Sequence, residues 1–337
     1  MNKQISASIA AVGLAATVAL YNLSAETTSL YQADTFSAAE VQFMQFVAKY
    51  GRTYGTKAEY QFRLNEFTQR LAEIEAHNSK NGETSTVGIN KFADYTKEEL
   101  KRLNGLRLDD QVALNETVFD VSNLKDEVNW VTAGAVTPVK NQGQCGSCWS
   151  FSTTGAMEGA HFVATGDLVS LSESQLVDCS WLNHGCNGGS MALAFMYTER
   201  HPLETEADYP YVAQNAKCTY DKSKGVVGAK SYSSVTANSP AQLKAAIAKG
   251  PVSVAIEADK TVFQAYTGGV LTSTECGTQL DHGVLAVGYG TENGQEYYLV
   301  KNSWGPDWGV DGYIKIGVAD GAGICGIQMM PVIPVTN

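Results

Sequence analysis

Hydrophobic residues recur at helical spacing in two stretches near the N-terminus. Ser37-Ala38-Ala39-Glu40 has the spacing of a capping box, and apolar residues continue after it at Val41, Met44, Val47 and Ala48, which predicts a first helix there. A second helix is predicted to begin near Lys57, because large apolar residues follow at steps of four and three: Tyr60, Leu64, Phe67, Leu71 and Ile74. Thr96 to Glu99 has the spacing that would cap a third, short helix.

From Cys148 onward, predicted helices come first and predicted strands follow. Helices are predicted at 148–164, with Ser147 as the N-cap and Gly166 as the stop, at 172–177 and at 191–200. Short β-branched or aromatic segments punctuated by glycine predict strands at 252–256, 283–287, 297–301 and 313–316. Helices followed by strands predict an α+β fold. Between Asn104 and Asn123 no period survives, so this stretch is expected to be an extended, exposed linker in which proteolytic nicking falls.

The first 25 residues have the pattern of a secretory signal peptide. Lys3 precedes an uncharged stretch from Gln4 to Ala25, and Leu23-Ser24-Ala25 offers a small-residue cleavage site. The alternative is an uncleaved membrane anchor, but the apolar part is shorter than the roughly 20 residues of a comfortable span and contains polar residues. We therefore expect the secretory pathway, with a lysosome, an acidic vacuole or the outside of the cell as destination, and no stable membrane insertion after signal removal.

Composition narrows the class of protein. The 337 residues are 44% hydrophobic, which supports a sizeable packed core. The net charge of −11 and the lack of a Lys and Arg cluster argue against nucleic acid as a partner. Seven cysteines in a secreted chain allow three disulfides, in 15 connectivities, and leave one reactive-thiol candidate. Asn115-Glu116-Thr117 has the pattern of an N-glycosylation acceptor.

The candidate chemistry centres on Cys148. It lies in the run QGQCGSCW, which begins at Gln142, and it precedes His282 by 134 positions and Asn302 by 154, close to the roughly 130 to 150 of papain-like enzymes. The segment Cys145–Trp149 fits the pattern C-G-[SA]-C-[WY] of that family at every position. The chain resembles papain and the cathepsin L-like cysteine proteases.

The resemblance implies a papain-like two-domain fold, with a helical left domain and a β-barrel-like right domain, preceded by a helical prodomain. It makes Cys148 the nucleophile, helped to ionise by a helix N-terminus and by the imidazolium of His282, and leads to a thioester acyl-enzyme. Asn302 would orient His282, and Gln142 with the Cys148 N–H would form the oxyanion hole. Trp304 would cover the His282–Asn302 pair.

Two motifs upstream resemble the inhibitory propeptides of this subgroup. Five of the six ERFNIN positions match, with Arg70 where asparagine is usual, and G-x-N-x-F-x-D follows; the matching residues are Glu59, Arg63, Phe67, Ile74, Asn78, Gly88, Asn90, Phe92 and Asp94. The alternative, an ordinary amphipathic helix pair, explains the periodicity but not both motifs in order. We expect an inhibitory propeptide at 26–123, with activation in acid, and the peptidase domain at 124–337.

The resemblance also implies the disulfides and the substrate-binding residues. The implied pairs are Cys145–Cys186, Cys179–Cys218 and Cys276–Cys325, with Cys148 free. The backbone of a substrate would pair at Gly189, next to Gly188 and Ser190. The pocket for the second residue before the scissile bond maps to Met191, Ala255, Leu280 and Met330, all apolar, which predicts a hydrophobic or aromatic preference.

Other interpretations stay open. Cys145 and Cys148 could form a redox C-x-x-C or half of a zinc site, although no second C-x-x-C or H-x-x-x-H follows. The chain could be a non-catalytic relative that binds peptides or inhibitors, or an acyl transferase using the same site. The leading interpretation is a monomeric cysteine endopeptidase made as a zymogen, without metal or other cofactor. Its partners would be peptide and protein substrates, its own propeptide, and inhibitors of the cystatin type.

Overall fold

The computed structural model describes residues 36–80, 82–108 and 114–336, so the predicted signal peptide lies outside the described residues. The chain divides into two compact units, one ending at Lys49 and the other spanning Tyr50–Asn337. The described part of the first unit is almost entirely helix α2 (Ala38–Tyr50). The predicted capping box is present, because Ser37 N–H donates to Glu40 Oε2 (2.7 Å) and Glu40 N–H to Ser37 Oγ (3.2 Å).

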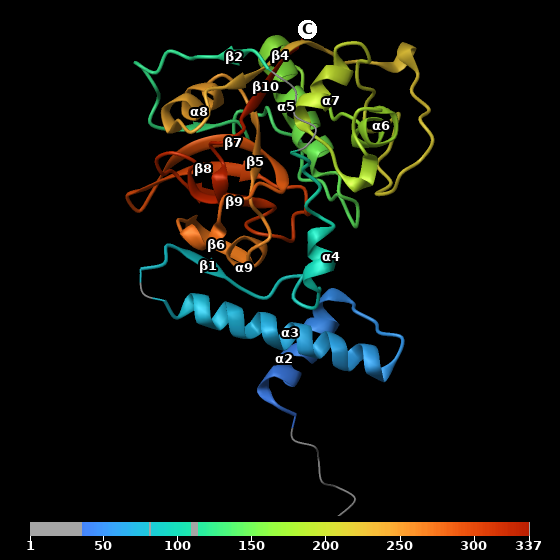
Figure 1. The fold of residues 1–337 in the computed structure, drawn as a ribbon, viewed down its shortest axis with the longest axis vertical. Coiled ribbons are helices and arrows are strands. Elements are labelled where there is room, and N and C mark those ends of the chain that lie inside the picture. Colours follow the sequence, from blue (N-terminus) through green and yellow to red (C-terminus); the bar gives the residue numbers. More distant parts are fainter. Residues whose placement is uncertain (1–35, 81, 109–113, 337) are drawn as a thin grey trace, which may run out of the picture. The chain divides into compact units, whose positions relative to one another are not determined.

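The larger unit begins with the rest of the pro-segment. Helix α3 (Lys57–Asn78) is capped by Thr56 and buries Leu64, Phe67 and Ile74, as the apolar stripe predicts. Strand β1 (Ser85–Val87) pairs with a strand of the peptidase part. Helix α4 (Lys97–Lys101) starts with the capping box expected at Thr96 and Glu99. Figure 1 shows α3 running beneath β1 and α9.

Helices dominate the first part of the peptidase region. Helix α5 (Cys148–Thr165) is buried over its first three turns and ends at Gly166, whose φ of 86° is the left-handed conformation of a glycine stop. Two shorter helices follow, α6 (Glu173–Cys179) and α7 (Met191–Thr198). All three match predicted helices within two or three residues. The predicted N-cap is wrong in one respect: the Ser147 hydroxyl bonds Tyr211 (2.6 Å) and caps nothing.

The later part forms a sheet with the strand order β1-β6-β9-β8-β7-β5-β10-β4-β2, with β3 paired to β7. Its strands are β2 (Glu116–Thr117), β3 (Val128–Asn129), β4 (Ala229–Val235), β5 (Val252–Ile256), β6 (Tyr266–Leu271), β7 (His282–Glu292), β8 (Gln295–Lys301), β9 (Tyr313–Gly317) and β10 (Val332–Thr336). The remaining helices are α8 (Pro240–Ile247) and α9 (Thr261–Gln264). The four predicted strands correspond to β5, β7, β8 and β9.

The hairpin β7–β8 determines where the candidate residues lie. It turns at Asn293-Gly294, both at positive φ, and pairs Leu285 with Lys301. His282 at the start of β7 and Asn302 just after β8 therefore meet at one end of the hairpin. Hydrogen bonds from Ser152 Oγ to Val284 O (2.7 Å) and from Ser253 Oγ to Ser152 O (2.8 Å) bind α5 to these strands.

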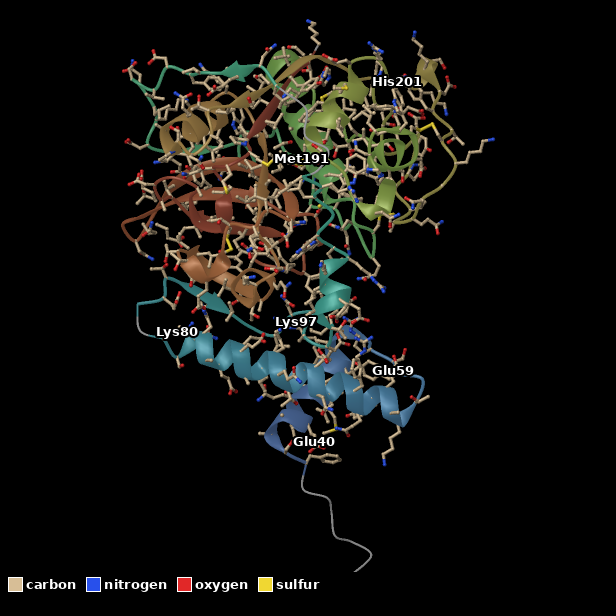
Figure 2. The ribbon with its side chains drawn as sticks, viewed as in Figure 1. Glu40, Glu59, Lys80, Lys97, Met191 and His201 are labelled. Carbon is tan, nitrogen blue, oxygen red and sulfur yellow. A yellow bond between two sulfur atoms is a disulfide. The ribbon has the colours of Figure 1, made fainter. Side chains whose placement is uncertain are left out.

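All seven cysteines lie in the described residues. The structure contains the three disulfides that the resemblance implies, Cys145–Cys186, Cys179–Cys218 and Cys276–Cys325. Cys148 is free and buried. Met191, labelled in Figure 2, opens α7 and packs with residues of β5 and β7 in one hydrophobic cluster, so it joins the helical part to the sheet.

Candidate active site

Cys148 is the first residue of α5. At this end of the helix the backbone N–H groups have no partner within the helix, and the helix dipole has its positive end. Its side chain is fully buried. Two backbone N–H groups donate to its sulfur, one from Gly105 (3.2 Å) and one from Gly283 (3.4 Å). Gly105 belongs to the pro-segment, so the nucleophile candidate is in direct contact with the segment that precedes the peptidase part.

His282 and Asn302 form the pair expected from the sequence. His282 Nε2 lies 2.8 Å from Asn302 Oδ1, and the backbone N–H of Ser303 donates to the same oxygen (2.7 Å). Because Ser303 identifies Oδ1 as an acceptor, the proton of this contact belongs to His282 Nε2. The Trp304 ring lies 4.9 Å from the imidazole, centre to centre, and is itself buried. Nδ1 of His282 is thereby left as the nitrogen that can take a proton.

Burial favours the neutral forms of Cys148 and His282 in this structure. It raises the pKa of Cys148 to about 11 and lowers the pKa of His282 to about 4. Among the described residues, His282 Nδ1 has no hydrogen-bond partner. The thiolate–imidazolium pair is thus disfavoured while the pro-segment is bound, and for the processed enzyme it stays a prediction.

The side-chain amide of Gln142 is already hydrogen-bonded at both ends. Its Nε2 donates to Leu103 O and to Cys145 O, each at 2.8 Å, and its Oε1 accepts from Ser303 Oγ at 2.7 Å. Because Leu103 O and Cys145 O can only accept, they fix which end of the amide is the donor. A carbonyl oxygen of the pro-segment therefore occupies the donor predicted for an oxyanion hole. The sequence analysis did not identify Ser303, and only its place next to Asn302 could have indicated it.

Residues Leu103–Arg107, here called the cleft strand, bind across the site through their backbone. Gly189 N–H donates to Gly105 O (2.8 Å), Arg107 N–H to Gly189 O (2.9 Å) and Leu106 N–H to Asp281 O (3.0 Å). This approach leaves no room for side chains, since a Cβ on Gly188 would lie 2.7 Å from Gly105 O. Gly189 thus pairs with a peptide backbone, as the resemblance implies for a substrate, whereas Gly188 bonds to Gly185 O and His184 N–H.

The residues predicted for the apolar pocket share one hydrophobic cluster with a side chain of the pro-segment. Met191, Ala255 and Leu280 are buried in one hydrophobic cluster, and Leu106 and Met330 pack against it half-buried. Ser190, also predicted, is buried and donates its N–H to Asn183 Oδ1 (2.8 Å), which fixes the chain between Gly189 and Met191. An aliphatic side chain of the cleft strand therefore packs against the residues predicted for the pocket.

Asp281, the residue before His282, adds an acid that was not predicted from the sequence. Its Oδ2 accepts from Asn104 Nδ2 and its Oδ1 from Ala258 N–H, both at 2.8 Å. Burial raises the pKa of Asp281 to about 6. The side chain of Asn104 is the exception in a stretch whose other hydrogen bonds to the site use backbone atoms.

A second region of the pro-segment, here called the platform, comprises α3, β1 and residues 88–94. Arg63 forms a bidentate pair with Glu99 (2.5 and 2.7 Å) and donates to Asp94 O. Asn78 exchanges two hydrogen bonds with Val87. These contacts join the three parts of the platform to one another and to α4.

Other motif residues connect the platform to the peptidase part. Asn90 Nδ2 donates to Gln264 O (2.8 Å), and the Phe92 ring packs edge-on against Trp304 (5.4 Å). Gly88 N–H donates to Ala265 O (2.8 Å). Of the remaining motif residues, Ile74 shares a hydrophobic cluster with Val87 and with Ala265 of the peptidase part, and Phe67 is buried. Glu59 accepts from Gly55 N–H, and Asp94 accepts from Tyr54.

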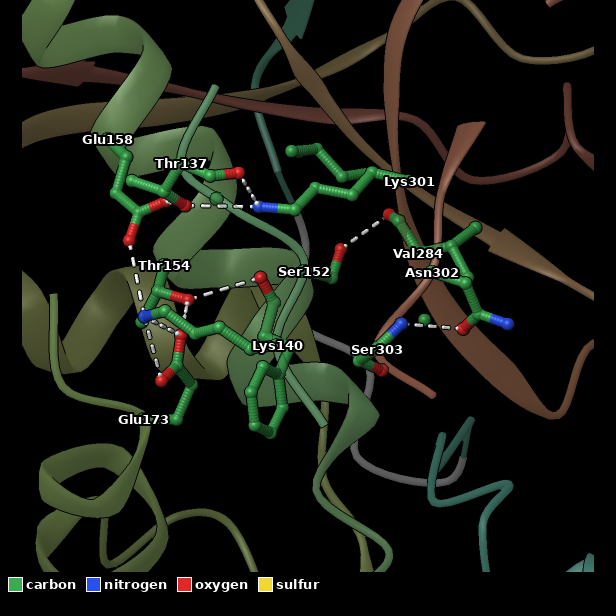
Figure 3. Close-up of a pocket in the computed structure, with 14 residues that line it drawn as sticks. Thr137, Lys140, Ser152, Thr154, Glu158, Glu173, Val284, Lys301, Asn302 and Ser303 are labelled. Carbon is green, nitrogen blue, oxygen red and sulfur yellow. Dashed lines mark hydrogen bonds and ion pairs between the residues drawn. The ribbon is translucent and has the colours of Figure 1, made fainter. Parts of the chain in front are cut away.

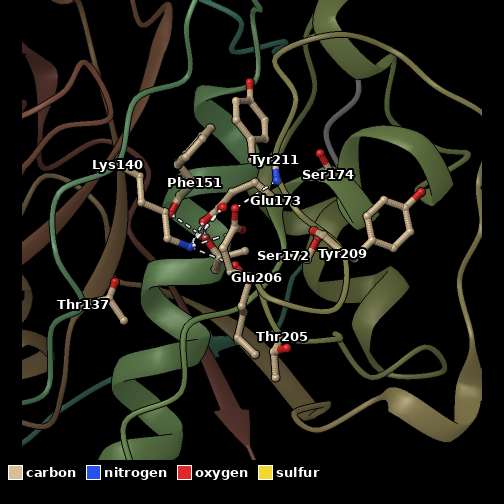
Figure 4. Close-up of polar contacts among 12 residues, drawn as sticks. Thr137, Lys140, Phe151, Ser172, Glu173, Ser174, Thr205, Glu206, Tyr209 and Tyr211 are labelled. Carbon is tan, nitrogen blue, oxygen red and sulfur yellow. Dashed lines mark hydrogen bonds and ion pairs between the residues drawn. The ribbon is translucent and has the colours of Figure 1, made fainter.

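A buried charged cluster behind the site was not predicted. Lys140 Nζ lies 2.8 Å from Glu173 and 3.5 Å from Glu158, and Figure 4 shows it beside Glu173 and Glu206. Burial raises the pKa of Glu173, whereas the surrounding carboxylates outweigh burial and raise that of Lys140. Lys140 is therefore charged, and it joins the loop that carries Gln142 to helices α5 and α6.

A cavity of about 20 Å³ separates this cluster from the catalytic residues, and Figure 3 shows Asn302 and Ser303 on its wall. That volume has room for a single water molecule. Lys301 Nζ donates to Thr137 O (2.7 Å) and Thr137 Oγ1 (3.0 Å) beside it. Because Lys301 precedes Asn302 directly, these bonds hold the end of β8 in place.

Within 36–80, 82–108 and 114–336, no group of three or more His, Cys, Asp or Glu side chains is placed to hold a metal ion. No helix in the same part of the chain is long and apolar enough to cross a membrane.

Comparison with known proteins identifies the family. Residues 124–335 match the papain family of cysteine proteases, and residues 43–100 match the cathepsin propeptide inhibitor domain. Digestive cysteine proteinase 1 of Homarus americanus is 46% identical over 290 residues, which cover 83% of this chain and 90% of that protein. Cysteine proteinase 5 of Dictyostelium discoideum is 43% identical over 297 residues, covering 81% and 86%. The structure of digestive procathepsin L 3 from the Tenebrio molitor larval midgut superposes with a TM-score of 0.80 at 38% identity, over 89% of this chain and 99% of that one.

The chain therefore belongs to the papain family of cysteine proteases. It is a papain-like cysteine endopeptidase with the cathepsin L-like fold, and it is made as a zymogen whose own propeptide is an intramolecular inhibitor. The individual catalytic roles, the substrate preference and the compartment go beyond what this likeness shows.

Proposed function

We propose that the processed enzyme cleaves peptide bonds with Cys148 as nucleophile and prefers a hydrophobic or aromatic residue second before the scissile bond. Release of the cleft strand lets water reach Cys148 and His282. Burial then no longer disfavours their charged forms, the thiolate and the imidazolium. The thiolate attacks the carbonyl carbon, and Gln142 Nε2 with the Cys148 N–H receives the oxyanion. His282 then protonates the departing amine, and water hydrolyses the thioester.

The observation that carries this proposal is the path of the cleft strand. It places a carbonyl oxygen on Gln142 Nε2, a backbone ladder on Gly189 and a leucine side chain in the cluster of Met191, Ala255 and Leu280. A peptide substrate needs the same three contacts. Burying an apolar side chain there gains about 1.5 to 3 kcal/mol, whereas a charged one would be left unpaired.

For localisation, we propose the secretory pathway, ending in an acidic compartment or outside the cell. The N-terminal signal pattern and the disulfides support this route, because disulfides persist in oxidising compartments.

The test is a pair of peptide reporters given to acid-processed enzyme. We expect Phe-Arg reporters to be cut well and Arg-Arg reporters poorly, and Met330→Glu to narrow the gap by pairing with the arginine. Val335→Glu, at a half-exposed position on β10, is the matched control and should leave the ratio unchanged. Equal turnover of both reporters by the unmodified enzyme would show that the pocket is misplaced.

Two simple measurements distinguish this proposal from the two alternatives, a binding protein without activity and an acyl transferase. A binding protein without activity would leave a thiol-reactive epoxide untitrated after acid processing. An acyl transferase would form amide products when an amine nucleophile is added, in preference to hydrolysis.

A further inference from the structure

The motif Asn115-Glu116-Thr117 takes no part in the chemistry above, and its place in the structure gives it a use. The sequence contains two Asn-x-Ser/Thr patterns, and the other, Asn22-Leu23-Ser24, lies in the predicted signal peptide. From Leu124 onward the sequence has none. An acceptor for N-linked sugar is thus available on the pro-segment and absent from the peptidase domain.

The local structure leaves the Asn115 side chain accessible. Strand β2 (Glu116–Thr117) is the edge strand of the sheet and pairs in parallel with Ser234 and Val235 of β4. Its neighbours Leu114 and Glu116 line a surface groove with Met330. Because side chains alternate along an extended chain, Asn115 faces away from that groove, and it is exposed.

The backbone at this point is fixed by contacts that a sugar would not disturb. Asn115 O accepts from Ser234 N–H (3.0 Å), and Gln242 clamps Phe119 through two hydrogen bonds, one to its N–H (2.7 Å) and one from its side-chain amide to its carbonyl (2.9 Å). All of these bonds use backbone atoms of the pro-segment. A glycosylated tail can therefore bind the peptidase part as described.

We propose that Asn115 is an N-glycosylation site of the precursor, and that its sugar is discarded with the pro-segment. The proposal rests on the secretory route proposed above. The donor is a lipid diphosphate-linked oligosaccharide of that pathway: a bond forms between Asn115 Nδ2 and the first sugar carbon, the sugar–phosphate bond breaks, Nδ2 loses a proton and the lipid diphosphate leaves. The sugar lies within the linker in which activation cleavage is expected, so a mature terminus near Leu124 removes it.

The experiment is translation of the full chain with microsomal vesicles, followed by protease protection and treatment with an amidase that removes N-glycans. We expect a protected chain that loses the mass of one glycan, with conversion of Asn115 to Asp. Asn115→Gln and Thr117→Ala should abolish the shift, whereas Thr117→Ser, which keeps the acceptor pattern, and Asn123→Gln, outside it, should retain the shift.

The outcomes separate this site from the route. A protected chain without sugar overturns the glycan and leaves the secretory route intact, and an unprotected chain overturns both. After acid processing of the glycosylated precursor, treatment with the amidase should leave the mass of the mature enzyme unchanged. A mature enzyme that still carries the sugar would overturn the proposal that it leaves with the pro-segment.

Discussion

The pro-segment contacts the peptidase part through two regions of different chemistry. The cleft strand uses backbone atoms almost throughout: its carbonyls and N–H groups bind Gln142, Cys148, Gly189 and Asp281. The platform uses side chains, among them Asn90 on Gln264 and Phe92 on Trp304. The cleft strand therefore blocks the site through its peptide backbone, whereas the platform recognises the enzyme through particular side chains.

This difference explains how one segment can resemble a substrate and still inhibit. Backbone contacts in the cleft would be available to any peptide, so they cannot distinguish the pro-segment from a substrate. The platform adds contacts outside the cleft that a short substrate lacks. By binding the sheet and Trp304, the platform raises the effective concentration of the cleft strand at Cys148.

The largest expected effect comes from removing the nucleophile while leaving both regions in place. Cys148→Ser should abolish peptide hydrolysis, because a hydroxyl is hard to ionise, and should leave a folded precursor, because Cys148 is outside every disulfide. Reporter hydrolysis after acid treatment and thermal unfolding measure the two parts.

Cys145→Ser is the contrasting variant. It removes the Cys145–Cys186 bridge and should cost about 2 to 5 kcal/mol of stability. If Cys145→Ser stays as stable as the unmodified chain and the oxidised protein contains a 145 to 148 bridge, the assignment of the nucleophile fails.

Gly105→Ala tests the backbone character of the cleft strand. A Cβ on Gly105 would lie 1.9 Å from Gly146 O and 2.4 Å from Gly146 C, both backbone atoms that cannot give way. We expect the cleft strand to lift, and the uncleaved precursor to hydrolyse reporters at neutral pH at least about tenfold faster, the equivalent of about 1.4 kcal/mol of lost inhibition.

Gly55→Ala is the matched control for Gly105→Ala, since its Cβ would be 3.7 Å from the nearest atom, an ordinary contact. It lies in the pro-segment before α3 and should leave the precursor silent. A silent Gly105→Ala precursor would show that the strand does not lie as close to Gly146 as described.

The two regions also differ in how far the sequence predicts them. The ERFNIN and G-x-N-x-F-x-D residues could be identified because side chains make the contacts, and a motif records side chains. The path of Leu103–Arg107 could not be predicted, because main-chain contacts do not require particular side chains, apart from the absence of one at Gly105. Lys140 and Ser303 were missed for another reason: their partners Glu173 and Gln142 are distant in sequence. Strand β4 was missed because its polar sequence lacks the β-branched enrichment used for the others.

Acid activation should depend on Glu99. The hydrogen bonds from Arg63 hold the pKa of Glu99 below its usual range, so the pair adds stability above about pH 4.5 that is lost as pH falls through the lowered pKa. Burial raises the pKa of Asp94, which has the opposite sign, since its protonation favours the folded precursor. Glu99, and not Asp94, therefore has the sign of a group that weakens the platform in acid.

Glu99→Gln should move activation to higher pH. Glutamine retains the capping interaction with Thr96 N–H and removes the charge that pairs with Arg63. Mass spectrometry across a pH series should show the new N-terminus, between Asn104 and Asn129, at a higher pH than in the unmodified precursor. Glu98→Gln, exposed in the same helical turn, should leave the midpoint in place. Equal midpoints for all three proteins would remove Glu99 from the acid response.

The smallest effect is expected at Arg70, where this chain departs from the propeptide motif. Its guanidinium donates to Thr261 Oγ1 (2.6 Å) and Glu73 Oε2 (3.1 Å), and Thr261 Oγ1 donates to Glu73 (2.6 Å), so one buried arginine joins α3 to the start of α9. Arg70→Asn restores the usual motif residue but is too short to reach Thr261. Losing about 1 kcal/mol here should speed acid conversion about fivefold. Thr261→Val removes the same contact from the other side, so the double variant should convert no faster than the faster single variant. Additive effects would show that Arg70 and Thr261 act independently and that the departure from the motif adds nothing to the platform.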